Sequence, residues 1–145
     1  MEIQHINASE TLSLRNKILR PDLELAECSY PGDNDSSTHH LGCIHNDNLV
    51  GIVSIYERVH EELHSGSSFQ IRAMATSESV RGQGIGLKLL RAAEALAFNS
   101  GAEYIWANAR EVAIGFYIKS GYKIKGKAFN IPNVGSHFLV YKLSS

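Results

Sequence analysis

The spacing of apolar and polar residues along the chain predicts strands and helices in alternation. Residues 69–76 (FQIRAMAT) alternate apolar side chains with polar or longer ones, which is typical of a strand with both faces partly covered. Residues 84–100 carry apolar side chains at helical spacing, and Gly101 follows where a helix ends. The other strands are predicted at 1–6, 41–45, 49–57, 103–109, 122–129 and 137–143, and the other helices at about 9–19, 22–27 and 112–120.

Turn-forming residues separate these elements. Residues 46–48 (NDN) tolerate the positive φ of a tight turn, so the strands on either side are predicted to form an antiparallel hairpin. Residues 30–38 (YPGDNDSST) are the strongest loop signal in the chain. Ser9 or Thr11 is expected to cap the first helix. The last two strands are predicted to pair across a long loop that contains Pro132 and Gly135.

This order of elements predicts one domain over residues 1–145, of the α/β (α+β) class. We expect a mixed, mostly antiparallel sheet of about six to seven strands flanked by about three to four helices. The sequence contains no linker, internal repeat or low-complexity segment that would divide the chain.

Composition narrows the class of protein. The chain has 145 residues, of which 43% are hydrophobic and 20% charged, with a formal net charge of -1 and a pI near 6.6. This balance gives no reason to expect a nucleic acid or a membrane as partner. Two cysteines cannot form a disulfide framework. The first residues, MEIQHI, lack the basic and apolar regions of a signal peptide, so we expect a cytoplasmic protein.

Three glycines at alternate positions carry the clearest chemical signal. Residues 80–87 read VRGQGIGL and lie between a predicted strand and the longest predicted helix. Such glycines let the backbone turn sharply and bring its N–H groups close to a ligand, at the positive end of the helix dipole. The segment therefore predicts an anion cradle suited to a pyrophosphate, and a ligand-free tight turn is the alternative. The spacing G-x-G-x-G matches neither the dinucleotide fingerprint nor a Walker A loop.

The segment RGQGIG (81–86) resembles the R/Q-x-x-G-x-G/A acetyl-CoA loop of the GNAT superfamily of N-acetyltransferases. Residues 116–122 (FYIKSGY) are similar to the late motif of the same family, and the order of elements resembles it from residue 1 to about 143. The resemblance implies acetyl transfer from acetyl-CoA, without a metal, to an amine of a small molecule or a protein, by direct attack in a ternary complex. It says nothing about the particular acceptor, and homodimer formation is left open.

The resemblance also implies roles for individual residues. Backbone groups of Met74, Ala75 and Thr76 would pair with the pantetheine arm, and amides near Met74 and Ala75 would stabilise the oxyanion. Tyr117 would donate its proton to the departing thiolate, for which a phenol is a suitable acid. The pyrophosphate would be held by the main chain of Arg81, Gly82, Gln83, Gly84, Ile85, Gly86 and Leu87.

The sequence departs from the family pattern at one cofactor position. Family members often carry Asn seven residues before the motif tyrosine, where this chain has Arg110. Either Arg110 contacts the cofactor in its place, with the phosphates as one candidate, or the contact is absent. Asn108 lies two residues earlier on the predicted strand, and the role is not transferred to it.

The residues that would bind and deprotonate the acceptor are not decided by the sequence. The resemblance places the acceptor among the first helices, the 30–38 loop and the long loop near 130–136, where Asp33, Asp35 or Glu57 could meet a cationic amine. Candidates for the base that the amine requires are Glu57, His39, His40, His137 and the loop from His60 to His64.

Two other functions compete with acetyl transfer. A non-catalytic coenzyme A sensor on the same fold would use the same glycine loop. A zinc-dependent hydrolase would use His60 and His64, because residues 60–64 (HEELH) formally match H-E-x-x-H. That motif requires a helix, and the glycine and serines at 65–68 leave no room for one. We therefore expect no metal site there.

Overall fold

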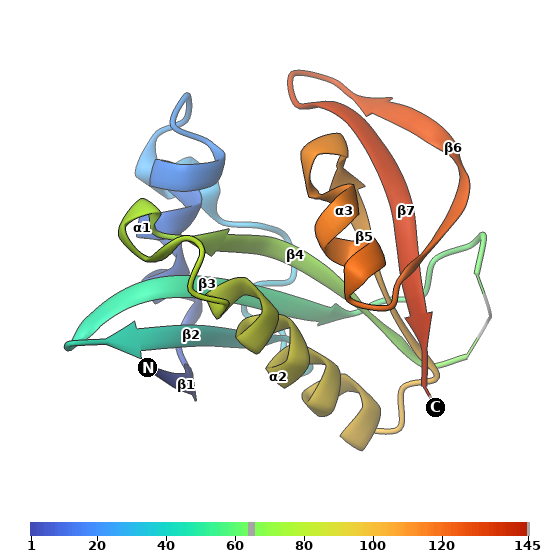
Figure 1. The fold of residues 1–145 in the computed structure, drawn as a ribbon, viewed down its shortest axis with the longest axis horizontal. Helices are drawn as coiled ribbons and strands as arrows, with labels where there is room; N and C mark the ends of the chain where they lie inside the picture. The colour runs from blue at the N-terminus through green and yellow to red at the C-terminus, as the bar shows by residue number, and fades with distance from the viewer. Residues whose placement is uncertain (64–65, 145) are drawn as a thin grey trace.

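The computed structural model describes residues 1–63 and 66–144, and these form one seven-stranded sheet with helices on both faces (Figure 1). The strands are β1 (Glu2–His5), β2 (His39–His45), β3 (Asn48–Glu57), β4 (Ser68–Thr76), β5 (Tyr104–Arg110), β6 (Lys123–Ile131) and β7 (Gly135–Leu143). The helical segments are α1 (Ala8–Leu14), η1 (Arg15–Leu19), η2 (Leu25–Cys28), η3 (Glu78–Val80), α2 (Ile85–Asn99), η4 (Glu111–Ala113) and α3 (Ile114–Lys119).

The sheet is mixed and mostly antiparallel, which confirms the predicted fold class. Its strand order is β1-β2-β3-β4-β5-β7-β6, and the pair β4–β5 is parallel whereas the other neighbours are antiparallel. A parallel pair needs a crossover, and α2 supplies it between β4 and β5. The apolar stripe of α2, including Leu89, Leu90 and Ala93, is fully buried in the main core cluster.

The opposite face of the N-terminal strands is covered by α1 and η1. Leu14 packs there with Ile52 of β3 and Ala75 of β4, and Ile18 lies against the same cluster. Neighbouring Val53 and Ile55 belong to the other core cluster. This separation follows from the alternation of side chains along a strand. The second core cluster therefore fixes η1 over the C-terminal half of β4.

The two central strands diverge after four residue pairs. Pairing of β4 with β5 runs from Ser68–Tyr104 to Ile71–Ala107 and then stops. Just beyond, Ala73 has a φ of 57°, and the register of β4 against β3 shifts at the same place. A bulge of this kind bends the strand that contains it. It turns residues 72–76 away from β5, and Figure 1 shows the two strands opening on this side.

The N-terminal helix begins earlier than predicted and changes geometry along its length. Its N-cap is Asn7, whose N–H donates to Glu10 at 2.8 Å, so the expected cap at Ser9 or Thr11 is wrong. The hydroxyl of Thr11 is buried and donates instead to the Ala8 carbonyl at 2.6 Å, inside the helix. From Arg15 the helix continues as the π-helical segment η1.

The C-terminal hairpin closes through a tight turn, so the long loop expected there is wrong. Ile131 pairs with Gly135, and Val134 N–H donates to the Ile131 carbonyl at 3.0 Å. Asn133 and Gly135 supply the positive φ angles of 65° and 120° that the turn requires. The whole outer strand β6 except its last residue is exposed.

Among the described residues, none of the helices is both long enough and apolar enough to cross a lipid bilayer.

Candidate active site

The glycine loop leads from η3 into α2 with the geometry of an anion cradle. Gly82 and Gly84 adopt φ angles of 84° and 78°, which favour glycine, and a Cβ at either would meet nothing within 4 Å. Gly84 is the N-cap of α2, and the first helical backbone bond runs from Lys88 N–H to its carbonyl at 3.1 Å. The amides at 85–87 therefore have no partner inside the helix and point out of its N-terminus.

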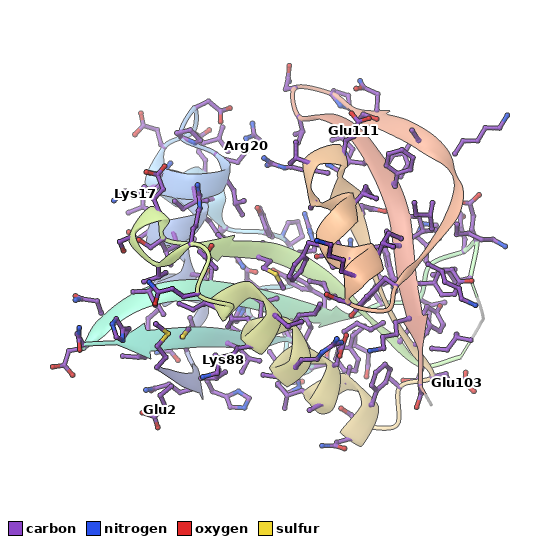
Figure 2. All side chains as sticks on the ribbon, in the orientation of Figure 1. Glu2, Lys17, Arg20, Lys88, Glu103 and Glu111 are labelled. Carbon is purple, nitrogen blue, oxygen red and sulfur yellow. The ribbon has the colours of Figure 1, made fainter. Side chains whose placement is uncertain are left out.

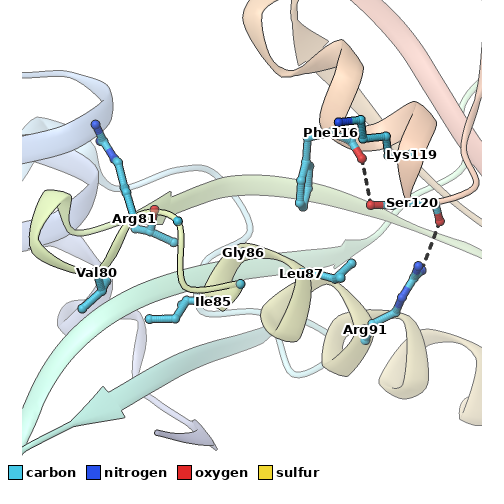
Figure 3. A pocket seen from close by; sticks show the side chains of 12 residues that line it. Val80, Arg81, Ile85, Gly86, Leu87, Arg91, Phe116, Lys119 and Ser120 are labelled. Atoms are coloured by element: carbon cyan, nitrogen blue, oxygen red, sulfur yellow. Dashed lines mark hydrogen bonds between the residues drawn. The ribbon is translucent and has the colours of Figure 1, made fainter.

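A cavity of about 400 Å³ adjoins this loop and is bounded on the other side by α3 (Figure 3). Gly86 and Phe116 approach across it, since a Cβ on Gly86 would lie 3.7 Å from the Phe116 ring. Arg91 donates to the Ser120 carbonyl at 3.1 Å and to Glu94 at 2.9 Å, which ties α2 to the end of α3. The lining residues are Thr76, Val80, Arg81, Gly82, Gly84, Ile85, Gly86, Leu87, Arg91, Phe116, Lys119 and Ser120.

The predicted cofactor residues divide into two groups. Seven of them line this cavity: Thr76, Arg81, Gly82, Gly84, Ile85, Gly86 and Leu87. The other four, Gln83, Met74, Ala75 and Arg110, do not line it, and neither does Tyr117, the expected acid. The sequence reasoning missed Arg91 and Lys119 as candidates for an anion, although Arg91 follows Leu87 by one helical turn and Lys119 lies within the FYIKSGY segment.

Tyr117 lies in the core between α3 and β6. Its side chain is 6% exposed and forms edge-on contacts with Phe116 and Tyr122, with ring centroids 5.3 and 5.2 Å away. Burial raises the pKa of the phenol above its ordinary value. Its hydroxyl has no hydrogen-bond partner in the part of the chain that the structure describes. Tyr117 therefore remains protonated at neutral pH and retains a hydroxyl hydrogen to donate.

Asn108 and Arg110 project to the face of β5 opposite α2. The alternate residues Ala107 and Ala109 belong to the core on the α2 side. The Oδ1 atom of Asn108 is buried and lacks a hydrogen-bond partner among the described residues. Arg110 donates from Nη2 to the Leu19 carbonyl at 3.3 Å, bridging the end of β5 and the end of η1. Arg110 is thus directed away from the glycine loop.

A buried network removes two candidates from acceptor chemistry. Arg15 is fully buried and donates to both Asp33 oxygens, at 2.7 and 3.1 Å. Burial alone would raise the pKa of Asp33, but hydrogen bonds from Arg15, Tyr30 N–H and Tyr56 outweigh it and lower the pKa to about 2. His40 has both ring nitrogens engaged, with Ser54 Oγ at 2.6 Å and the Asp33 carbonyl at 2.9 Å. Asp33 and His40 are therefore structural groups.

Three further base candidates also lie in unsuitable surroundings. His39 packs edge-on against His5, with centroids 5.9 Å apart, on the α2 side of the sheet near Phe69. His60 packs edge-on against Trp106 at 4.7 Å, and its Nδ1 accepts from Glu62 N–H at 3.0 Å. Glu57 is exposed at the end of β3.

His137, on β7 beside the last residue of β5, keeps one ring nitrogen without a hydrogen bond to the described residues. It is 4% exposed, and its Nδ1 lies 2.8 Å from the Gly135 carbonyl. A carbonyl can only accept, so Nδ1 carries the hydrogen and Nε2 keeps a lone pair. His137 is the register partner of Arg110, so both side chains project to the same face.

The HEELH segment at 60–64, which formally matches a zinc motif, is described only in part. Residues 60–63 form a turn and not a helix, with Leu63 N–H donating to the His60 carbonyl at 3.0 Å, and His64 lies outside the described residues. Within 1–63 and 66–144 no group of three or more His, Cys, Asp or Glu side chains is placed to hold a metal ion.

Arg72 is a residue that the sequence reasoning did not single out. It is the first residue of β4 beyond the last pair with β5, and it is half-buried opposite Ser54. Its guanidinium contacts the rings of Tyr30 and Tyr56, 4.4 and 5.6 Å from their centroids. No carboxylate of the described residues forms an ion pair with Arg72 or with Arg110. The available signal in the sequence was a single charged residue in an otherwise uncharged strand.

The sequence comparison assigns this fold, with its splayed strands, glycine loop and cavity, to a family of acetyltransferases. The family model described as acetyltransferase (GNAT) family matches residues 3–122, and the chain belongs to that family. It is 34% identical over 142 residues to the uncharacterized N-acetyltransferase YitI of Bacillus subtilis (strain 168), covering 98% of this chain and 95% of YitI. The protein is accordingly an N-acetyltransferase, which favours the enzyme over the sensor and the hydrolase.

Solved structures share the fold at low sequence identity. An aminoglycoside 6'-N-acetyltransferase complexed with coenzyme A superposes with a TM-score of 0.78 at 16% identity, over 99% of this chain and 97% of that chain. A ribosomal-protein-alanine N-acetyltransferase from Brucella melitensis gives a TM-score of 0.76 at 17% identity, over 99% of this chain and all (100%) of that chain. These two acceptors differ in kind, so the fold leaves the acceptor of this chain to be argued from its own residues.

Proposed function

We propose that the protein transfers an acetyl group from acetyl-CoA to an amine by direct attack of the amine on the thioester. The observation that carries this proposal is the glycine loop at the start of α2 beside the edge of β4 that is unpaired beyond Ile71. The structural neighbour that binds coenzyme A supports the choice of acyl donor.

The residues around the glycine loop fit coenzyme A. The space over Gly82 and Gly84 is open, and the amides at 85–87 are free to bind phosphate oxygens. Arg81 and Lys119 add positive charge at the same cavity. The backbone of Met74, Ala75 and Thr76, which β5 does not cover, would pair with the pantetheine arm, and its amides would stabilise the oxyanion.

Two side chains would move protons. His137 Nε2 would take the proton from the attacking amine, because its lone pair is free while Nδ1 is engaged by Gly135. Tyr117, which is held protonated by its burial, would donate to the departing thiolate. The base and the acid approach from opposite faces of the sheet, since His137 faces η1 and Tyr117 lies on the α3 side.

The acceptor would also carry an anionic group. Arg72 and Arg110 project to the same side of the diverging strands, and neither has a carboxylate partner among the described residues. Nearby Arg20 is neutralised by Asp22 at 2.8 Å, and Asp33 is taken up by Arg15. Figure 2 shows Arg20 near the N-terminal helices and Glu111 near the start of α3. Two guanidiniums without a carboxylate in ion-pair contact favour a carboxylate-bearing amine over a polycation.

Release of coenzyme A thiol tests the proposal with a matched pair of acceptors, an α-amino acid and its carboxamide. The carboxamide has the less basic amine, so a preference for the acid cannot arise from easier deprotonation. We expect the acid to give the higher kcat/KM and a cationic diamine to give little turnover. Equal turnover of acid and carboxamide would rule out the anionic acceptor, and no thiol release with any amine would rule out the activity.

A further inference from the structure

A tight turn at residues 30–33 (YPGD) lies beside Arg72. Pro31 and Gly32 occupy its centre, Gly32 has a φ of 92°, and Asp33 N–H donates to the Tyr30 carbonyl at 3.1 Å. Proline followed by a glycine of positive φ is the pattern of a type II turn. The turn therefore has a defined conformation, although it lies in the strongest loop signal of the sequence.

The buried ion pair fixes this turn to the sheet. The Asp33 carboxylate accepts from Tyr30 N–H at 2.9 Å and from Arg15 at 2.7 Å. It also accepts from the Tyr56 hydroxyl of β3 at 2.5 Å. Gly32 itself lies close to the Tyr56 ring, since a Cβ there would be 3.3 Å from it. Asp33 thus anchors the turn to η1 and to β3 together.

The anchored turn places the Tyr30 ring against two guanidiniums. The central carbons of Arg15 and Arg72 each lie 4.4 Å from the ring centroid. Arg15 is held by the ion pair, whereas Arg72 has only the rings of Tyr30 and Tyr56 as recorded partners in the described part of the chain. Stacking on a ring leaves the N–H groups of a guanidinium free at its edge.

We propose that the turn at residues 30–33 determines acceptor specificity by holding the Tyr30 ring against Arg72, so that Arg72 is oriented in advance for the anionic group of the acceptor. Tyr30 is a positioning residue, since it acts through Arg72. Without the ring, Arg72 would be free to adopt many rotamers and would lose that freedom on binding. This inference rests on the proposed function, so the experiments below distinguish a failure of the positioning role from a failure of the proposed function.

The first test compares Tyr30→Leu with Tyr30→Phe on the α-amino acid and its carboxamide. Tyr30→Leu removes the ring, and we expect the KM for the acid to rise about five- to tenfold, a typical effect of losing a partly desolvated cation–π contact. The KM for acetyl-CoA, the kcat and the kinetics with the carboxamide should be unchanged. Tyr30→Phe keeps the ring and should restore the wild-type KM, because no hydrogen bond of the Tyr30 hydroxyl is recorded within the described residues.

A second variant disturbs the turn without touching either partner of the stack. Gly32→Ala introduces a Cβ at a φ of 92° and 3.3 Å from the Tyr56 ring, which strains the turn. We expect a rise of KM for the acid in the same direction as in Tyr30→Leu. A rise that is equal for acid and carboxamide in both variants would show general damage and overturn the proposal.

Arg72→Gln separates this inference from the proposed function. If Arg72→Gln abolishes the preference for the acid while Tyr30→Leu leaves it intact, the positioning role of Tyr30 is wrong and the anionic acceptor stands. If Arg72→Gln leaves the preference unchanged, the assignment of Arg72 itself is wrong. Lys125→Gln on the exposed strand β6 is the control for loss of one positive charge.

Discussion

Arg110 of β5 and His137 of β7 are register partners on neighbouring strands, and their side chains project to the same face of the sheet. The pair lies at the last residue of β5, where the strand has already separated from β4, and its side chains project away from the glycine loop. The guanidinium of Arg110 reaches the Leu19 carbonyl at 3.3 Å, while His137 is oriented by the Gly135 carbonyl at 2.8 Å. A cation and a proton acceptor are thereby held at one end of the opening.

The first prediction concerns His137 as the base. We expect His137→Gln to lower kcat roughly 100- to 1,000-fold, because a positioned base typically contributes about that much. The KM for acetyl-CoA should be unchanged, since His137 lies on the other face of the sheet from the cavity. Steady-state kinetics with the preferred amine measure both values. His5→Gln, on the exposed strand β1, is the control, and a kcat within twofold of wild type in His137→Gln would exclude the role.

The second prediction distinguishes two tyrosines of the FYIKSGY segment. Tyr117→Phe should lower kcat with little loss of stability, because the Tyr117 hydroxyl has no recorded hydrogen bond among the described residues. Tyr122→Phe should instead lower the free energy of unfolding by about 1–3 kcal/mol and keep kcat, since it leaves buried Glu94 without the donor now at 2.7 Å. Steady-state kinetics give kcat and chemical denaturation gives the free energy of unfolding for both variants. The reverse pattern would assign the acid role to Tyr122.

The third prediction concerns the glycine loop. Gly84→Ala meets no atom within 4 Å but must adopt a φ of 78°, so we expect a loss of stability of about 1–2 kcal/mol from backbone strain. The distorted loop should also weaken acetyl-CoA binding, which calorimetry can measure. Gly115→Ala in α3 is the matched control, because it too meets nothing within 4 Å and needs no positive φ. Unchanged acetyl-CoA affinity in Gly84→Ala would count against the cradle.

The fourth prediction is a pH dependence of stability that comes from Asp33. Its pKa is lowered from 3.8 to about 2 in the folded protein, so ionised Asp33 stabilises the fold above pH 4. This contribution, about 2 kcal/mol, is lost as the pH falls from about 4 to about 2. Denaturation of the wild type and of Asp33→Asn across this range should give a stability difference that shrinks at low pH. A constant difference would show that Asp33 does not titrate in this window.

The hairpin at 39–57 and the long helix α2 show what can be predicted from local pattern. Asn46 and Asp47 have φ angles of 50° and 63°, as the turn prediction required, and Gly101 ends α2 with a φ of 92°. The glycine loop was located in the same way, since its chemistry depends on backbone conformation. The predicted cap of α1 was wrong because several nearby polar residues could cap the helix. Asn7 is the N-cap, and the hydroxyl of Thr11 donates to the Ala8 carbonyl inside the helix.

The sequence by itself determined the class of the fold, the family resemblance and the position of the glycine loop, because those depend on the periodicity of side chains and on the torsion angles that glycine permits. The tertiary structure decided which of the polar residues remain available for chemistry. Asp33 and His40 were candidates for the site, but their side chains are hydrogen-bonded to Arg15 and Ser54. These partners lie 18 and 14 positions away in the sequence. Arg72 was recognised only from the structure, and Arg110, which the sequence offered for the cofactor, proved to lie on the other face of the sheet. Both depend on pairing between distant segments, which no local pattern contains.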